Sequence, residues 1–317
     1  MSEPEIGTKA PESDATDVPQ NEEASGQSGP AVGEHCTSDR PLLSADIQPS
    51  GTIGKLGDID TYISKPPSYP SVPAPLLLLL TGGTGIYSPN NQHQADKYAS
   101  CGFVVIMPDQ FGSDPAPATN TTPSLLDSIK LKAAETAKSF LIDMWLARQT
   151  REKVLPRLHR VLEAARDEYA DCLAHSGGGI YAAGYCFGAK YVLILAGERQ
   201  LETGSKGKGK GNKDTVPVPF PPLKAGAVAH GTLVTREDVK GIKAPVSVVA
   251  VENDPLFPEE ILDIGRKHLA SSGISHEVRV YAGVPHGFAV VGDYADAHIQ
   301  AEQEKAFAQM LGWLKSH

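Results

Sequence analysis

The most specific chemical signal in the sequence is the pentapeptide GYCFG at 184–188. An apolar run at Ile180–Ala183 precedes it and a helical stretch begins near Phe187, which predicts a sharp turn from a strand into a helix. Such a turn projects its central side chain above the sheet, and the flanking glycines avoid collisions. Cys186 would then stand at a helix N-terminus, which favours a thiolate, and the N–H of Phe187 would face a developing oxyanion. We expect a cysteine nucleophile, with a small buried turn cysteine as the alternative.

Two polar residues that follow late apolar runs would complete a hydrolytic triad. Asp254 comes after the run Val246–Val251, and His286 comes after Glu277–Tyr281. The order nucleophile, acid, histidine is the one that accompanies a nucleophile elbow, with the acid after a late strand and the histidine after the last strand. His286 would take the thiol proton from Cys186 or share an ion pair with the thiolate, and Asp254 would hold the imidazole in the useful tautomer.

Each of these two residues has a simpler alternative. Asp254 precedes a proline and could be a turn or cap residue, and His286 could be an ordinary loop histidine. Glu252 is a rival for the acid, although Asp254 is better placed if it lies just beyond the strand. Finding all three residues in the required order at strand ends favours the triad.

Alternating strands and helices must position these side chains. Apolar runs predict strands at Leu76–Thr81, Phe103–Met107, Ile180–Gly184, Ala225–His230, Val246–Val251 and Glu277–Tyr281, with a more polar strand at Asp58–Ser64. Helical stretches are expected at Asn91–Ser100, Ser124–Arg148, Val154–His175, Phe187–Glu198, Glu259–Ala270 and Ala295–Lys315. This alternation predicts an α/β fold with a mostly parallel central sheet and helices on both faces, with the chemistry at the carboxyl ends of the strands.

Two biased segments flank or interrupt this pattern. Residues 1–40 hold nine acidic residues against two basic ones and no aromatic residue, which predicts a disordered acidic tail. A stretch at about 202–224 contains a Lys-Gly repeat followed by prolines, which is typical of a surface loop insertion; a small basic patch is the alternative. We therefore expect a single domain over residues 41–317 with a low-complexity insertion.

Composition narrows the class of partner. The chain has 317 residues and a formal net charge of −9, most of it in the tail, so the folded part is nearly neutral and offers no basic face for nucleic acid. No apolar run is long enough to span a membrane and no secretory signal is visible, so we expect a cytoplasmic protein. The four cysteines lack the spacing of zinc ligands or of a disulfide scaffold, and we expect no metal.

The motifs resemble the dienelactone hydrolase family of the α/β-hydrolase superfamily. The resemblance rests on GYCFG at 184–188, DPLFP beginning at Asp254, VPHGF ending at Phe288 and MPDQF beginning at Met107, and it covers roughly residues 36–317. The segments NQHQAD at 91–96 and CTSDRP at 36–41 are similar to the sequences of the fungal branch of that family. The resemblance implies a cysteine hydrolase of small esters or lactones that works through an acyl-thioester intermediate without a cofactor.

One departure from the family concerns the loop after the first buried strand. Bacterial dienelactone-cleaving members carry a glutamate there that contacts the resting thiol, whereas this chain reads TGGTG at 81–85. We expect the backbone N–H of Gly83 or Thr84 to supply the second oxyanion donor. Activation of the thiol must then rest on His286 and the helix N-terminus.

Three further residues are candidates for the substrate pocket. His230 ends a predicted strand, Trp145 lies on an amphipathic helix where a core role is the simpler alternative, and Phe288 follows the histidine motif. Pocket shape sets acyl specificity, so the triad alone cannot separate an esterase or lactonase from a thioesterase or acyl-product hydrolase of a secondary pathway. A non-catalytic binding protein on the same scaffold is the third hypothesis. We expect a monomer or homodimer that acts on a small molecule.

Overall fold

The computed structural model describes residues 38–41, 48–117, 141–198 and 222–317. The expected tail up to residue 37, most of the expected insertion and the expected helical residues 124–140 lie outside these ranges. Among the described residues, none of the helices combines the length and the apolar character that crossing a bilayer requires.

The described strands form one eight-stranded sheet in the order β1-β2-β4-β3-β5-β6-β7-β8. Pairing is antiparallel between β1 and β2 and between β2 and β4, and it is parallel between all other neighbours. The strands are β1 (Thr52–Leu56), β2 (Ile59–Ser64), β3 (Leu76–Leu80), β4 (Val104–Pro108), β5 (Ile180–Tyr185), β6 (Leu223–Ala229), β7 (Val246–Val251) and β8 (His276–Tyr281). The predicted mostly parallel sheet is confirmed.

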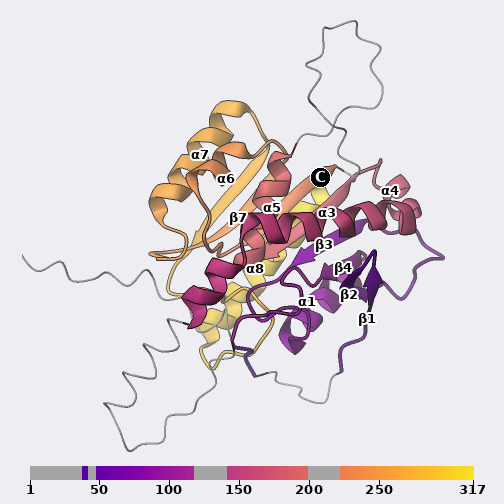
Figure 1. The fold of residues 1–317 in the computed structure, drawn as a ribbon. Helices are drawn as coiled ribbons and strands as arrows, with labels where there is room; N and C mark the ends of the chain where they lie inside the picture. Colours follow the sequence, from indigo (N-terminus) through magenta and orange to yellow (C-terminus); the bar gives the residue numbers. More distant parts are fainter. Residues whose placement is uncertain (1–37, 42–47, 118–140, 199–221) are drawn as a thin grey trace, which may run out of the picture.

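Helices cover both faces of this sheet (Figure 1). They are α1 (Pro89–Ser100), α3 (Arg151–Glu168), α4 (Ala170–His175), α5 (Phe187–Gly197), α6 (Arg236–Gly241), α7 (Glu259–Ser272) and α8 (Ala297–Ser316). Every residue of β3 is buried, and its leucines alternate between two apolar clusters. Leu76, Leu78 and Leu80 face α3, α5 and α7, whereas Leu77 and Leu79 face α1 and α8.

The structure differs from the sequence expectation in three elements. Strand β1 was not expected, because its residues TIGKL are mostly exposed and it pairs only with β2 at the sheet edge. The six-residue helix α6 was also not expected; a capping box between Thr235 and Asp238 starts it. The single helix expected over Val154–His175 is two helices, α3 and α4, which meet at Tyr169, where the backbone leaves the helical conformation.

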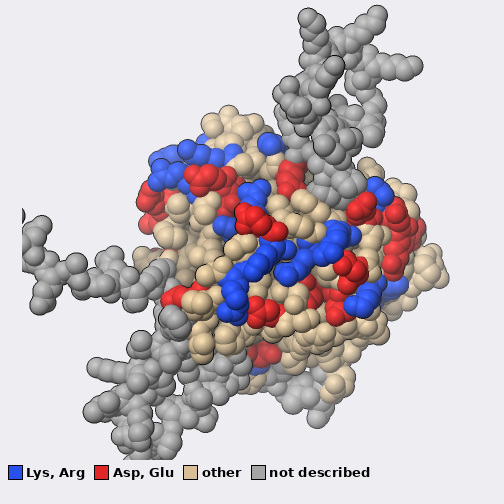
Figure 2. Space-filling view, viewed as in Figure 1, with Lys and Arg blue, Asp and Glu red and all other residues tan. Residues whose placement is uncertain are grey.

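Charges of both signs are mixed on the face of the molecule seen in Figure 1. Figure 2 shows lysine and arginine side chains beside aspartate and glutamate side chains on this face. Exposed ion pairs link Arg160 to Asp58 at 2.7 Å and Arg148 to Asp114 at 3.2 Å. Exposed pairs of this kind contribute little to stability.

The carboxyl ends of the parallel strands gather the polar residues that sequence analysis singled out. Thr81–Gly85 follows β3, Cys186 follows β5, Asp254 comes after β7 and His286 comes after β8. Strands β3, β5, β6, β7 and β8 are consecutive in the sheet, so their loops share one edge. The fold therefore brings residues from distant parts of the chain to one place.

Gly188 offers a direct test of how closely α5 packs on β3. A Cβ atom at Gly188 would lie 2.3 Å from the Leu80 backbone oxygen, which cannot move without disturbing the sheet. We predict that Gly188→Ala lowers the free energy of unfolding by about 3 kcal/mol, because overpacking outweighs the roughly 1 kcal/mol that alanine gains in a helix. Urea unfolding followed by circular dichroism measures this change.

Gly312 provides the matched control. It lies within α8, and a Cβ atom there would meet nothing within 4 Å. Gly312→Ala should therefore raise the free energy of unfolding by about 0.5–1 kcal/mol. Equal stability of the two variants would contradict the close packing described for Gly188.

Candidate active site

Cys186 occupies a strained turn between β5 and α5. Its backbone has φ 51° and ψ −115°, a conformation that non-glycine residues adopt only when the surrounding structure enforces it. Its N–H donates to the Ala229 oxygen at 3.1 Å, and the Gly188 N–H donates to the Thr81 oxygen at 2.9 Å. A Cβ atom at Gly184 would lie 2.7 Å from Val192, so glycine is required there for the helix to approach. The turn thus has the geometry that the GYCFG motif predicts.

Asp254 and His286 form a short buried pair. His286 Nδ1 lies 2.7 Å from Asp254 Oδ2, and the other carboxylate oxygen accepts the backbone N–H of Leu256 at 3.0 Å. Both side chains are more than nine-tenths buried. An ionised carboxylate only accepts hydrogen bonds, so Nδ1 carries the hydrogen, and Nε2 lies on the opposite side of the ring, toward Thr232.

The pKa of His286 reflects opposing influences. Burial disfavours the charged ring, but the hydrogen bond to Asp254 and the neighbouring Cys186 outweigh it and raise the pKa to about 9. An imidazole with this pKa holds a second proton at neutral pH. The pair is therefore suited to stand as an imidazolium beside a thiolate.

Sequence analysis did not find Thr232, whose side chain contacts both Cys186 and His286. Its Oγ1 lies 3.2 Å from Cys186 Sγ and 3.2 Å from His286 Nε2. The side chain is buried, and its backbone N–H donates to the Cys186 oxygen at 3.1 Å. The signal available in the sequence was a hydroxyl residue just after the strand that ends near His230.

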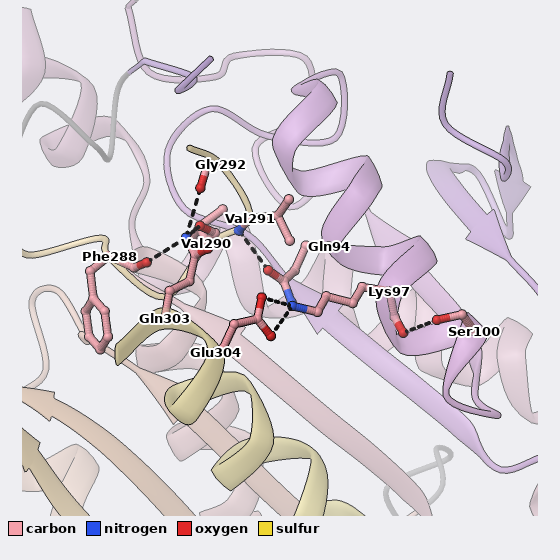
Figure 3. A network of polar contacts seen from close by, with 9 residues as sticks. All are labelled: Gln94, Lys97, Ser100, Phe288, Val290, Val291, Gly292, Gln303 and Glu304. Atoms are coloured by element: carbon pink, nitrogen blue, oxygen red, sulfur yellow. Dashed lines mark hydrogen bonds and ion pairs between the residues drawn. The ribbon is translucent and has the colours of Figure 1, made fainter. Parts of the chain in front are cut away.

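The loop after His286 is fixed by two glutamines (Figure 3). Gln303 of α8 donates from Nε2 to the backbone oxygens of Phe288 and Val290, at 3.0 and 2.7 Å, and also lies 3.2 Å from the Gly292 oxygen. Gln94 of α1 accepts the Val291 N–H at 2.9 Å. The two helices are themselves linked by the ion pair between Lys97 and Glu304 at 2.9 Å. Side chains from both helices therefore hold the segment that carries the histidine.

A small, partly open cavity lies over Cys186. It holds about 390 Å³ of empty space, including solvent at its mouth. Most of its side chains are polar, and its lining consists of Ser38, Asp39, Arg40, Gly82, Thr84, Asn90, Asn91, Cys186, His230, Gly287, Val290 and Val291.

The three pocket candidates take different positions. His230 lines the cavity, and its ring centre lies 5.0 Å from that of His286. Trp145 packs in the core against Phe187 and donates its Nε1–H to the Asp114 oxygen at 2.7 Å. Phe288 is fully buried behind His230, with ring centres 6.2 Å apart. Neither of these last two lines the cavity.

The loop after β3, which carries Gly83 and Thr84, passes close to Cys186. Thr84 lines the cavity, and a Cβ atom at Gly82 would lie 3.9 Å from Cys186 Sγ, so the loop after β3 passes next to the sulfur. The Gly83 oxygen accepts the Ala116 N–H at 2.8 Å, which anchors this loop. Phe187 begins α5 directly after Cys186. Across the described ranges, no group of three or more His, Cys, Asp or Glu side chains is arranged to hold a metal ion.

Residues 38–41, here called the mouth segment, form one wall of the cavity. The Ser88 hydroxyl donates to Asp39, and the Pro41 oxygen accepts the Asp293 N–H at 2.9 Å. The Arg40 guanidinium lies 3.9 Å from the centre of the Tyr294 ring. The final residues of the expected tail therefore contact the folded domain beside the thiol.

Comparisons with known proteins find relatives of this chain in sequence and in fold. The chain is 29% identical over 272 residues to Hydrolase tropI of Talaromyces stipitatus, covering 85% of this chain and 91% of that protein. It is 26% identical over 268 residues to Dienlactone hydrolase 1 of Gibberella moniliformis, covering 84% and 88%. Its fold is similar to the crystal structure of a putative dienelactone hydrolase from Klebsiella pneumoniae, with a TM-score of 0.61, 16% identity and coverage of 84% and 98%.

The sequence profile of the dienelactone hydrolase family matches residues 59–205 and 215–317. These ranges include the strained turn, the acid and the histidine, and they span well over half of the chain. The chain belongs to the dienelactone hydrolase family.

Proposed function

We propose that this protein is a cysteine hydrolase that cleaves small carboxylic esters or lactones through an acyl-thioester intermediate, with no cofactor. The observation that carries the proposal is the continuous buried chain of contacts from Cys186 through Thr232 and His286 to Asp254, which opens on the cavity. Membership of the family and the names of its relatives support ester hydrolysis. The contacts among these side chains support the choice of nucleophile, base and acid.

In the acylation step, the Cys186 thiolate attacks the ester carbonyl carbon, and the carbonyl oxygen becomes an oxyanion. The N–H groups of Phe187 and of Gly83 or Thr84 are the proposed donors to that oxyanion. The His286 imidazolium then gives its proton to the leaving alkoxide as the carbon–oxygen bond breaks. An alcohol leaves, or the ring of a lactone opens, and the acyl group remains on sulfur.

In the deacylation step, neutral His286 takes a proton from a water molecule as the water attacks the thioester carbonyl. The carbon–sulfur bond breaks, the acid leaves, and the thiolate and the imidazolium are restored. Asp254 stabilises the imidazolium at both stages through its hydrogen bond to Nδ1. These steps balance without a metal or an electron carrier.

The cavity favours a compact, oxygen-bearing substrate. Its space is limited to about 390 Å³, and its polar lining includes Thr84, Asn90, Asn91, Asp39 and Arg40. A long alkyl chain would leave those polar groups without partners, which costs binding energy. His230, at the base of the cavity, is the proposed side-chain contact nearest the triad.

The first prediction concerns the nucleophile. Cys186→Ala should abolish turnover of a short aryl ester while leaving the circular dichroism spectrum unchanged. In the wild-type protein, iodoacetamide should alkylate Cys186 at pH values well below ~8.5, the pKa of a free cysteine. Cys101→Ala, at a half-buried cysteine outside the cavity, is the matched control and should keep full turnover. Near-normal turnover by Cys186→Ala would rule out the proposed mechanism.

The second prediction concerns pH. Because the pKa of His286 is raised to about 9, its imidazolium persists through neutral pH and is lost only as pH rises through that value. For an alkyl ester, whose leaving group needs a proton, kcat/KM should therefore fall above about pH 9. Asp254→Asn should move this alkaline limb to lower pH and reduce turnover by orders of magnitude, up to ~10⁴-fold. A wild-type limb centred near pH 6.5 would contradict the assignment.

The third prediction separates the mouth segment from the rest of the tail. Removing residues 1–34 should leave kcat/KM unchanged, since a segment without aromatic residues and with scattered prolines should make few packing contacts. Removing residues 1–41 should lower kcat/KM about tenfold, chiefly through KM, as expected for a loss of about 1.4 kcal/mol of binding energy. The melting temperature of both truncated chains reports on folding. Identical kinetics for the two truncations would show that the segment plays no part in binding.

A further inference from the structure

Asn90 lies in the first turn of α1 and lines the cavity over Cys186. The residue is only 4% exposed. Within the described parts of the chain, no hydrogen bond involves its side-chain amide, although such a group can both donate and accept. Buried polar side chains usually have a hydrogen-bond partner in the protein or in ordered water. An amide without a protein partner at the wall of a cavity is therefore suited to bind a ligand.

The neighbouring Asn91 shows what a structural asparagine does at this place. Its Nδ2 donates to Thr84 Oγ1 at 2.9 Å and to the Gly85 oxygen at 2.8 Å, so both of its amide hydrogens hold the loop after β3. Its backbone N–H donates to the side chain of Ser88, which caps α1. The loop and the helix end are thus held without the Asn90 amide.

Packing restricts the position of the Asn90 amide. A Cβ atom built on Gly292 would lie 2.8 Å from Asn90 Nδ2 and 2.8 Å from Arg40 Cβ, so a side chain on Gly292 would displace its neighbours. Gln303 Nε2 lies 3.2 Å from the Gly292 oxygen and helps to hold this backbone in place. A polar group that is already held in position loses less entropy when it binds a ligand. The amide is therefore prepared to accept a partner inside the cavity.

We propose that Asn90 binds a second oxygen function of the substrate, so that the hydrolase proposed above selects small esters or lactones that carry a hydroxyl or keto group besides the scissile carbonyl. This selectivity rests on the proposed function and specifies its substrate class. The amide N–H groups can donate to a keto or hydroxyl oxygen, and the amide oxygen can accept from a hydroxyl. A plain alkyl chain can do neither, and it would bury the amide without a partner, which costs free energy.

Ethyl esters of one acyl length test this role. The kcat/KM values of ethyl 2-hydroxybutanoate, ethyl 3-hydroxybutanoate and ethyl 3-oxobutanoate are each divided by that of ethyl butanoate, with the released acid titrated at constant pH. Asn90→Leu should lower at least one of these ratios about tenfold relative to the wild-type protein, which corresponds to the loss of about one hydrogen bond. The intrinsic reactivity of each ester is the same for both proteins, so it cancels in this comparison.

Gln92→Leu is the matched control for the loss of an amide from the same helix. Gln92 Nε2 donates to the Ile86 oxygen at 2.9 Å, and the residue does not line the cavity. Its substitution should leave all three ratios at their wild-type values. The melting temperature of each variant reports on folding. If Asn90→Leu does not fold, Asn90→Ala removes the same amide without a branched side chain and should produce the same fall.

The possible results separate failure of the selectivity from failure of the proposed function. If the wild-type protein hydrolyses none of these esters, the proposed function is rejected and the selectivity with it. If it hydrolyses them and the substitution of Asn90 changes none of the ratios, ester hydrolysis stands and the role of Asn90 alone is rejected. An equal fall in Gln92→Leu would also reject that role, because packing of α1 would then set the ratio. A fall confined to the Asn90 variant supports it.

Discussion

The close approach of helix α5 to strand β3 sets the position of everything at the active edge. At Gly188 the helix lies so near the Leu80 oxygen that no side chain fits between them. The same approach lets the Gly188 N–H bond the Thr81 oxygen, and it brings the loop at Gly82 against the Cys186 side chain. The strained backbone at Cys186 persists because these contacts leave it no relaxed alternative. Backbone packing of α5 on β3 therefore positions Cys186 and the neighbouring loop, without help from any charged group.

The buried side chains of Asp254, His286 and Thr232 form hydrogen bonds with one another or with the backbone. Asp254 uses both carboxylate oxygens, one for His286 and one for the Leu256 N–H, and the far side of the imidazole meets the Thr232 hydroxyl. In a dry environment each such contact is strong, and an unmatched group is costly. The arrangement keeps an ionised carboxylate buried and raises the pKa of His286 without exposing either to bulk water. Chemistry that needs a stable imidazolium at neutral pH follows from that balance.

Local sequence patterns predicted the elements that carry the proposed triad. The glycines that bracket Cys186 are required by two close approaches, and such requirements show in the sequence as fixed spacing. Asp254 and His286 could be placed because each comes shortly after the end of a parallel strand, and parallel strands end at one edge. Strand β1 escaped prediction because an edge strand with Gly54 and Lys55 lacks the apolar run of a buried strand.

Contacts between distant residues could not be predicted in this way. Thr232 meets Cys186 across 46 positions and His286 across 54, and no local pattern records such distances. The mouth segment has the polar composition of a tail, yet at Arg40 it packs against Tyr294 from the other end of the chain. Trp145 looks in the sequence like any other large aromatic residue on a helix. The sequence alone therefore could not decide whether it packs in the core or lines the pocket.

The hydrogen bonds that Gln303 makes to the loop after His286 have a consequence for biosynthesis. Gln303, which bonds the backbone on both sides of Val290, is translated after the histidine, the acid and the cysteine. A nascent chain that has reached His286 carries Cys186, Asp254 and His286 but lacks α8, whose Gln303 bonds this loop. We therefore expect the loop to become ordered only after α8 has been synthesised and has docked against the sheet.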